Sequence, residues 1–235
     1  MADGNDAITT QPPPRGCLSR ALVLALMLAA AGLGVAMYFM AQPQDLSHIH
    51  GYAPNERPQP SRNLGLLLQN SLDRAYPVTF TEGEVNGWLQ SSLQARQGGL
   101  FAEHVALDGV WLRLEEGRAE VVLERKLWGH PLTVSMYLQV EHLETDQGTT
   151  TEVQFHGGEF HPYVPFPKCG GRFGRLPVPQ GFLHLLLPAF KKLAAVFPEE
   201  LRLGFVEMPR VNIADGHITF DPRGPKPIAV SPPSP

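Results

Sequence analysis

The sequence has no surplus of basic residues and almost no cysteine. Its 235 residues carry a net charge of −4 at pH 7, with 19 Lys and Arg against 23 Asp and Glu. Such a chain presents no broad cationic surface, so we expect no nucleic-acid partner. The two cysteines, Cys17 and Cys169, lie on opposite sides of the apolar segment described below, which argues against a disulfide framework.

Recognised catalytic motifs are also missing. There is no G-x-S-x-G elbow, no Walker loop, and no G-x-G-x-x-G turn that opens a helix. Cys169 has no defined base in the sequence to activate it. The glutamates at 115, 116, 120 and 124 lie at strand ends or on the polar face of a predicted strand, where they serve solubility. We therefore expect neither catalytic activity nor a cofactor.

Charge is absent from residues 21–41, which form one apolar run. As a helix this run measures about 31 Å, which matches the hydrocarbon core of a bilayer. Arg15 and Arg20 precede it, and the next basic residue is Arg57. The positive-inside rule therefore predicts a cytoplasmic N-terminus and an extracytoplasmic main domain, periplasmic or at the cell surface. A cleaved signal peptide is the alternative, although the run exceeds the usual length of about 7–15 apolar residues.

Proline is abundant, with 23 residues gathered largely before residue 60 and after residue 221. Segments of this composition form extended tails and linkers. The pattern predicts five parts: a cytoplasmic tail (1–20), a transmembrane helix (21–41), a proline-rich tether (42–62), an α+β domain (63–221) and a disordered tail (222–235).

Within the predicted domain, helical signals come first. Residues 63–76 suggest a short helix, and a second begins after Thr81, a good N-cap with Glu84 three residues on to complete a capping box. Phe80 and Val85 are spaced to form a hydrophobic staple around this start. Apolar residues then recur at helical spacing as far as the Gly-Gly pair at 98–99, which favours a helix end.

The periodicity then changes to two, which is typical of strands. Alternation is clearest over residues 132–140 and recurs over 110–114, 119–127 and 153–155, with turn signals between the runs. A final pair of strands, 202–213 and 217–220, is joined at Asp215-Gly216. We predict an α+β fold: a curved antiparallel meander with one apolar and one polar face, packed on two or three helices.

The order of these features resembles a known family. An apolar membrane helix, the stretch FTEGEVNGWL, long alternating strands, a GRLPVP turn before an apolar helix, and the hairpin VNIADGHITF follow one another. This layout is similar to the single-pass YpmS-like proteins of bacteria and, more loosely, to periplasmic tubular lipid-binding (TULIP-like) proteins. The resemblance implies a curved sheet wrapped on a helix, an apolar interior able to take acyl chains, and no catalytic residues.

Residues 176–198 are unusually apolar for a soluble domain. Pro188 lies in the middle of this stretch, where a proline predicts a kink or a restart of the helix. The segment suits a core helix, a ligand-lined helix or a membrane-touching helix, and its composition leaves these open. For a hydrophobic ligand we predict a lining from the sheet, the first helix and this segment: Trp88, Val134, Met136, Leu138, Leu183, Leu186 and Phe190.

Residues 156–171 form a glycine-rich insertion with several aromatic side chains. His156, Glu159 and His161 have the chemistry of zinc ligands but not a recognised spacing, so we expect no metal. A surface loop is the simplest interpretation. Phe160, Tyr163 and Phe166 are alternatively placed to contact a protein partner or a bilayer.

Together these features predict a membrane-anchored, extracytoplasmic, non-catalytic domain that binds a lipid or another hydrophobic ligand. The alternative is a structural or assembly subunit that docks on a membrane complex through its transmembrane helix and the segment 156–171. The two differ in interior volume, because a lipid-binding protein needs an unfilled apolar cavity.

Overall fold

The computed structural model describes residues 17–52, 62–96, 107–127, 129–145, 148–161 and 163–223. The chain divides into two compact units, residues 1–38 and 39–235. Helix α1 (Cys17–Ala41) provides the first unit and the start of the second. Its segment Ser19–Ala41 is long and apolar enough to cross a membrane, as the charge-free run predicts.

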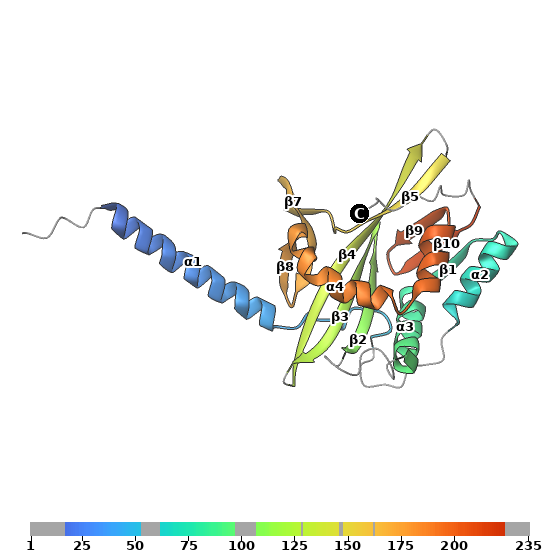
Figure 1. Cartoon of the computed structure of the whole chain (residues 1–235), viewed down its shortest axis with the longest axis horizontal. Coiled ribbons are helices and arrows are strands. Elements are labelled where there is room, and N and C mark those ends of the chain that lie inside the picture. Colours follow the sequence, from blue (N-terminus) through green and yellow to red (C-terminus); the bar gives the residue numbers. More distant parts are fainter. Residues whose placement is uncertain are drawn as a thin grey trace, which may run out of the picture. The chain divides into compact units, whose positions relative to one another are not determined.

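The second unit has an α+β fold with a large antiparallel sheet, which confirms the predicted class (Figure 1). Its helices are α2 (Leu64–Arg74), α3 (Glu82–Arg96), α4 (Leu183–Ala194) and α5 (Pro198–Leu201), with helical turns η1 (Gln180–Phe182) and η2 (Arg202–Glu207). Figure 1 shows α4 crossing the strands of the large sheet, while α3 lies beside the sheet's β2 edge.

Seven strands form the large sheet, in the order β2-β3-β4-β7-β6, with β5 paired to β4 and β8 paired to β7. The predicted meander covers β2 (Leu107–Glu115), β3 (Arg118–Leu127), β4 (His130–Thr145) and β5 (Gly148–Gln154). The remaining strands are β6 (Glu159–His161), β7 (Val164–Phe173) and β8 (Leu176–Pro179). Gly117 and Gly129 adopt φ values of 72° and 82° in the first two turns, a conformation that favours glycine.

A second sheet has three strands in the order β1-β10-β9: β1 (Val78–Thr81), β10 (His217–Asp221) and β9 (Arg210–Ala214). The predicted hairpin at Gly216 is present. The strand predicted over 202–213 is wrong in its first half, because Arg202–Glu207 forms η2. The adjacent residues Leu203 and Gly204 are both buried there, a pattern that a helical turn produces and a half-buried strand does not.

Helix α3 begins with the predicted capping box. The Thr81 amide donates to Glu84 Oε2 (2.9 Å), and the Glu84 amide donates to Thr81 Oγ1 (3.2 Å). Phe80 and Val85, the predicted staple pair, are both buried. This local signal therefore places the helix correctly against the core.

Side chains of α3 hydrogen-bond the backbone at the edge of the large sheet. Asn86 Oδ1 accepts from the Leu112 amide (2.7 Å), and Asn86 Nδ2 donates to the Leu112 carbonyl (2.8 Å). Glu82 Oε2 accepts from the Leu114 amide (2.6 Å). The helix thus bonds β2 in the place of a neighbouring strand.

Residues 42–52, assigned to the tether from their composition, are packed on the large sheet. Leu46 and Ile49 are buried there against Trp111 and Val122, with Tyr52 at the edge of this small cluster. The sheet face predicted to be polar and wet is therefore covered where this segment crosses it. The segment is held there by two apolar side chains three residues apart, Leu46 and Ile49. Two such residues in a polar sequence are too few to predict that the segment packs on a sheet.

The glycine-rich insertion forms β6 and β7 instead of a surface loop. Glycine is required at Gly171, where a Cβ would lie 2.0 Å from the Ser135 carbonyl oxygen of β4. At Gly157 a Cβ would lie 2.6 Å from the Tyr137 ring. These glycines allow the backbone of the insertion to approach the sheet closely. The abundance of glycine alone would suggest that the segment is a loop.

Helix α4 continues through Pro188, where the sequence predicts a kink or a restart. Pro188 and His184 are both exposed, so water can bind the carbonyl that the proline leaves without a helical donor. A sharp change of direction, 104° between residues 180–194 and 198–207, follows α4. Phe197 precedes Pro198 and has left the helical region (φ −123°, ψ 48°), as a residue before proline tends to do.

Candidate functional site

An apolar cavity of about 240 Å³ lies between the large sheet, the helices and the small sheet. Strands β2 to β5 form one wall, and α2 to α5, η2 and the β9–β10 pair form the others. Every lining residue is apolar except Glu200. The arrangement offers an unfilled apolar space next to the core.

The strand register explains where this space arises. Along β3, Ala119 and Val121 face the cavity, and Leu138 and Val140 do so along β4. Ala119 is the direct partner of Leu138. A small side chain, Ala119, therefore stands beside a large one, Leu138, in the wall. The space that the small side chain leaves is part of the cavity.

Two exposed residues mark the cavity's mouth. Ala194 and Leu201 line the cavity and are exposed, Leu201 to 38%. They flank the bend between α4 and α5. Glu200, the one ionisable lining residue, lies at this same end.

The predicted ligand-lining residues fall into two groups. Three of them line the cavity: Trp88, Leu138 and Phe190. The other four belong to the same core but lie outside the lining: Val134, Met136, Leu183 and Leu186. Met136 is the partner of Gly171, so this second group packs toward the β7 side of the sheet.

Sequence reasoning missed the lining contributed by the C-terminal helical turns. Phe197, Leu201 and Phe205 enter the cavity from the α4–α5 bend and from η2. No local signal in the sequence marks this segment as helical, because the burial of Leu203 and Gly204 appears only in the structure.

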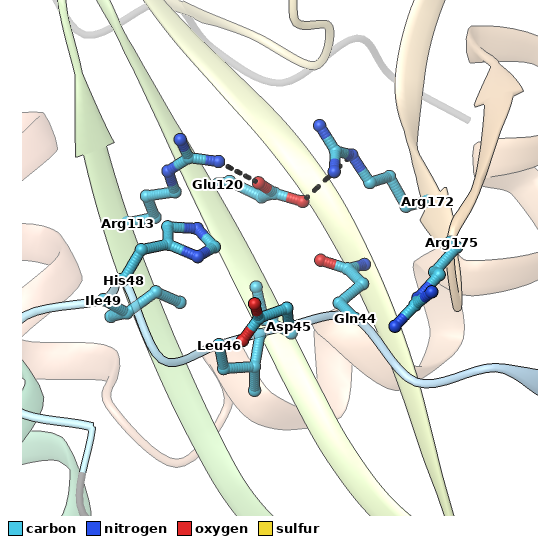
Figure 2. Close-up of a pocket in the computed structure, with 10 residues that line it drawn as sticks. Gln44, Asp45, Leu46, His48, Ile49, Arg113, Glu120, Arg172 and Arg175 are labelled. Carbon is cyan, nitrogen blue, oxygen red and sulfur yellow. Dashed lines mark ion pairs between the residues drawn. The ribbon is translucent and has the colours of Figure 1, made fainter.

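A polar cavity of about 430 Å³ lies on the opposite face of the large sheet (Figure 2). The segment after α1 crosses it, and β2, β3, β7 and the β7–β8 turn supply the rest of its wall. Its lining is Gln44, Asp45, Leu46, His48, Ile49, Arg113, Glu120, Val122, Arg172 and Arg175.

Glu120 occupies the floor of this cavity and is only 2% exposed. The Ser135 hydroxyl donates to Glu120 Oε1 at 2.5 Å. Arg113 Nη1 lies 3.8 Å from Oε2, and Arg172 Nε lies 3.8 Å from Oε1 (Figure 2). The carboxylate thus sits between two guanidinium groups without a close hydrogen bond to either.

Tyr137 holds Arg172 in place, because Arg172 Nε donates to the Tyr137 hydroxyl oxygen at 3.0 Å. Burial and the nearby Glu120 carboxylate raise the pKa of Tyr137 to about 12. The phenol is therefore neutral at physiological pH.

Gln44 attaches the covering segment to the same floor. Its amide donates to Thr133 Oγ1 (2.8 Å), and its side-chain Nε2 donates to Ser135 Oγ (3.2 Å). The lid of the polar cavity is thus fixed by specific hydrogen bonds.

Of the predicted contact residues of the insertion, Phe160 lies on β6, Tyr163 in the turn after β6, and Phe166 on β7. Phe160 is 42% exposed and Tyr163 is 87% exposed, while the Phe166 side chain lies outside the described residues. His156 is buried, with Nε2 2.7 Å from Gln154 Oε1 and 3.0 Å from Lys168 Nζ. Across the described ranges, no three His, Cys, Asp or Glu side chains are grouped so as to hold a metal.

No protein-family model and no curated protein matches this chain. The resemblance to YpmS-like and tubular lipid-binding proteins therefore stays a prediction.

Proposed function

We propose that this chain is a single-pass membrane protein whose non-catalytic domain lies outside the cytoplasm and binds a lipid or another hydrophobic ligand. The apolar cavity of about 240 Å³ carries the proposal. The span Ser19–Ala41 supports the anchor. Arg15 and Arg20 before it support the orientation.

The energetics of an empty cavity favour a ligand. Apolar side chains that line an unfilled space lack packing partners, so a ligand that fills the space stabilises the domain. Each buried methylene group of a ligand recovers about 0.8 kcal/mol.

The size of the cavity indicates what part of a ligand enters. An apolar cavity of about 150 Å³ is known to accept a benzene molecule. A space of 240 Å³ therefore suits part of an acyl chain more than a whole lipid. The mouth at Leu201 and Glu200 leaves the polar end of such a ligand at the surface.

Native mass spectrometry of the full chain, released from detergent micelles, tests the proposal. Wild type should carry bound lipid masses, and Val121→Phe should lose most of them because the phenyl ring occupies the cavity. Lipids around the membrane helix stay in both proteins, so the difference between them is the signal. Leu185→Phe, on the exposed side of α4, is the matched control and should keep the wild-type pattern. Equal lipid binding by wild type and Val121→Phe would contradict the proposal.

The exposed aromatic pair Phe160 and Tyr163 favours a second function, that of an assembly subunit docked on a membrane complex. A photo-crosslinking residue in place of Tyr163 would then capture the same protein partner in wild type and in Val121→Phe. Leu185→Phe should crosslink equally. No crosslinked partner would rule this function out.

A further inference from the structure

Three guanidinium groups converge on the polar cavity from separate parts of the fold. Arg113 comes from β2, Arg172 from β7 and Arg175 from the β7–β8 turn (Figure 2). Each guanidinium offers five N–H donors in a planar fork that fits the oxygens of a phosphate group. Like charges repel one another, so an assembly of this kind needs an anion among them.

The protein supplies only part of that negative charge. Asp45 and Glu120 are the carboxylates in the lining, against three arginines, which leaves a surplus of one positive charge among these five side chains. Glu120 also accepts from Ser135 and stands 3.8 Å from each of its two arginines. Its negative charge lies between the Arg113 and Arg172 guanidinium groups and offsets part of their mutual repulsion, without a close hydrogen bond to either.

The donors of the arginines are unequally used. Arg113 is also paired with Glu115 at 3.0 Å, and Arg172 Nε is directed at Tyr137. Arg175 makes a long hydrogen bond from Nε to the Pro43 carbonyl, at 3.4 Å. In the described part of the chain, no carboxylate pairs with Arg175, so its terminal nitrogens remain available to a ligand.

From this geometry we infer that the polar cavity binds a phosphate-class oxyanion, either soluble or carried by a lipid headgroup. Arg172 and Arg175 are its principal donors, with Arg113 completing the ring. The site lies across the sheet from the apolar cavity and does not depend on the function proposed above.

The wall of this cavity touches the end of the apolar helix. The Arg175 amide donates to the Phe39 carbonyl at 3.1 Å. Gly174, with φ 55°, lies so close to this backbone that a Cβ would be 2.3 Å from the Gln42 carbonyl oxygen. If α1 spans a bilayer, its end stands at the level of the lipid phosphates. Lipid headgroups and soluble phosphate are then both within reach.

The full chain in phosphatidylcholine nanodiscs, titrated calorimetrically with inorganic phosphate, tests the inference. Wild type should bind phosphate, and Arg175→Gln should weaken binding about tenfold, the loss expected for one charged hydrogen bond. Glu120→Gln should strengthen binding about tenfold, because it removes the carboxylate that competes with the ligand. A gain in affinity is not a result that misfolding produces.

Two control variants show whether phosphate binding depends on this cavity in particular. Arg210→Gln removes one exposed positive charge from β9 in the small sheet and should leave phosphate binding unchanged. Val121→Phe should also leave it unchanged, whatever happens to lipid in the apolar cavity. No phosphate binding by both wild type and Glu120→Gln would overturn the inference. Equal binding by wild type and Arg175→Gln would do so as well.

The source of the anion is decided by changing the bilayer. Phosphatidic acid, a lipid with a phosphate monoester headgroup, replaces part of the phosphatidylcholine in a second set of nanodiscs. Suppressed phosphate binding in these discs identifies a lipid headgroup as the occupant. Unchanged phosphate binding identifies a soluble phosphate compound. Both results require the arginine dependence seen in phosphatidylcholine.

Discussion

The two faces of strand β3 line two different cavities. Ala119 and Val121 face an apolar cavity, while Glu120 and Val122 face the opposite side, with its charged cavity. One residue of alternation separates the two environments. A single sheet can therefore carry two unrelated cavities, provided that each face has its own cover.

The two covers are built by different means. Helices distant in sequence cover the apolar face, and side chains such as Leu68 and Phe190 hold them by hydrophobic burial. The segment 42–52 covers the polar face with two buried side chains, Leu46 and Ile49, and with the hydrogen bonds of Gln44 to β4. An apolar face thus tolerates a cover that leaves some space unfilled. On a polar face, each donor or acceptor that the cover buries needs its own hydrogen-bond partner.

Trp111→Ala should have the largest effect, because it removes the β2 side chain on which the covering segment 42–52 packs. Trp111 is 1% exposed, packs edge-on against Tyr52 (4.8 Å between ring centroids) and donates from Nε1 to Glu124 Oε2 at 3.1 Å. We expect a loss of about 3–5 kcal/mol in the free energy of unfolding, measured by urea denaturation of the full chain in micelles. Tyr163→Ala, at a highly exposed position, should cost less than about 0.5 kcal/mol. A Trp111→Ala loss as small as that of the control would show that the cover is not packed as described.

Neighbouring substitutions on β3 should separate the two faces with an intermediate effect. Val122→Phe forces a ring among the buried side chains of Leu46, Ile49 and Trp111 and should cost about 1–3 kcal/mol in the free energy of unfolding. Val121→Phe places the same ring in the apolar cavity and should cost much less, or stabilise the domain. Urea denaturation of both variants measures the difference. If both cost the same, the apolar cavity is not open to a ring of this size.

The smallest effect concerns pH and is confined to the polar face, where His156 is buried beside Gly157. Burial, and then the nearby Lys168 charge, lower the pKa of His156 below its ordinary value of about 6.5. The unfolded chain then binds a proton at a higher pH than the folded one. The contribution of neutral His156 to the free energy of unfolding is fully present above pH 6.5. It falls as the pH drops through 6.5 toward the pKa of His156 in the folded protein.

His156→Gln should flatten this part of the stability curve, measured by thermal unfolding between neutral and mildly acidic pH. His184→Gln alters an exposed histidine of α4 and should keep the wild-type slope. An unchanged slope in His156→Gln would assign the acid sensitivity to other groups.

The sequence predicts those helices and strands whose signals lie within a few neighbouring residues. The capping box of Thr81 and Glu84 marks the start of α3, and alternation with glycine turns predicts β2 to β5. These features depend on residues a few positions apart, so one sequence contains them entirely. The apolar helix near the N-terminus is of the same kind.

The features that sequence does not predict depend on distant contacts. Gly171 pairs with Met136 of β4 so closely that the Ser135 carbonyl leaves no room for a side chain, and nothing near Gly171 in the sequence indicates this contact. The polar cavity brings together Gln44, Glu120 and Arg175 from segments far apart in the chain. By its local pattern Glu120 is a solubilising charge, since its burial follows only from the cover formed by residues 42–52.

The side chains of α3 that bond β2 affect whether the large sheet can pair with the sheet of a second molecule. An edge strand with free amides and carbonyls is a template for pairing with a second chain. Here Asn86 and Glu82 already bond Leu112 and Leu114, and Gln90 Nε2 donates to the Val110 carbonyl at 2.8 Å. Copies that met along this edge would find these positions occupied, so the sheet is protected there against pairing from molecule to molecule.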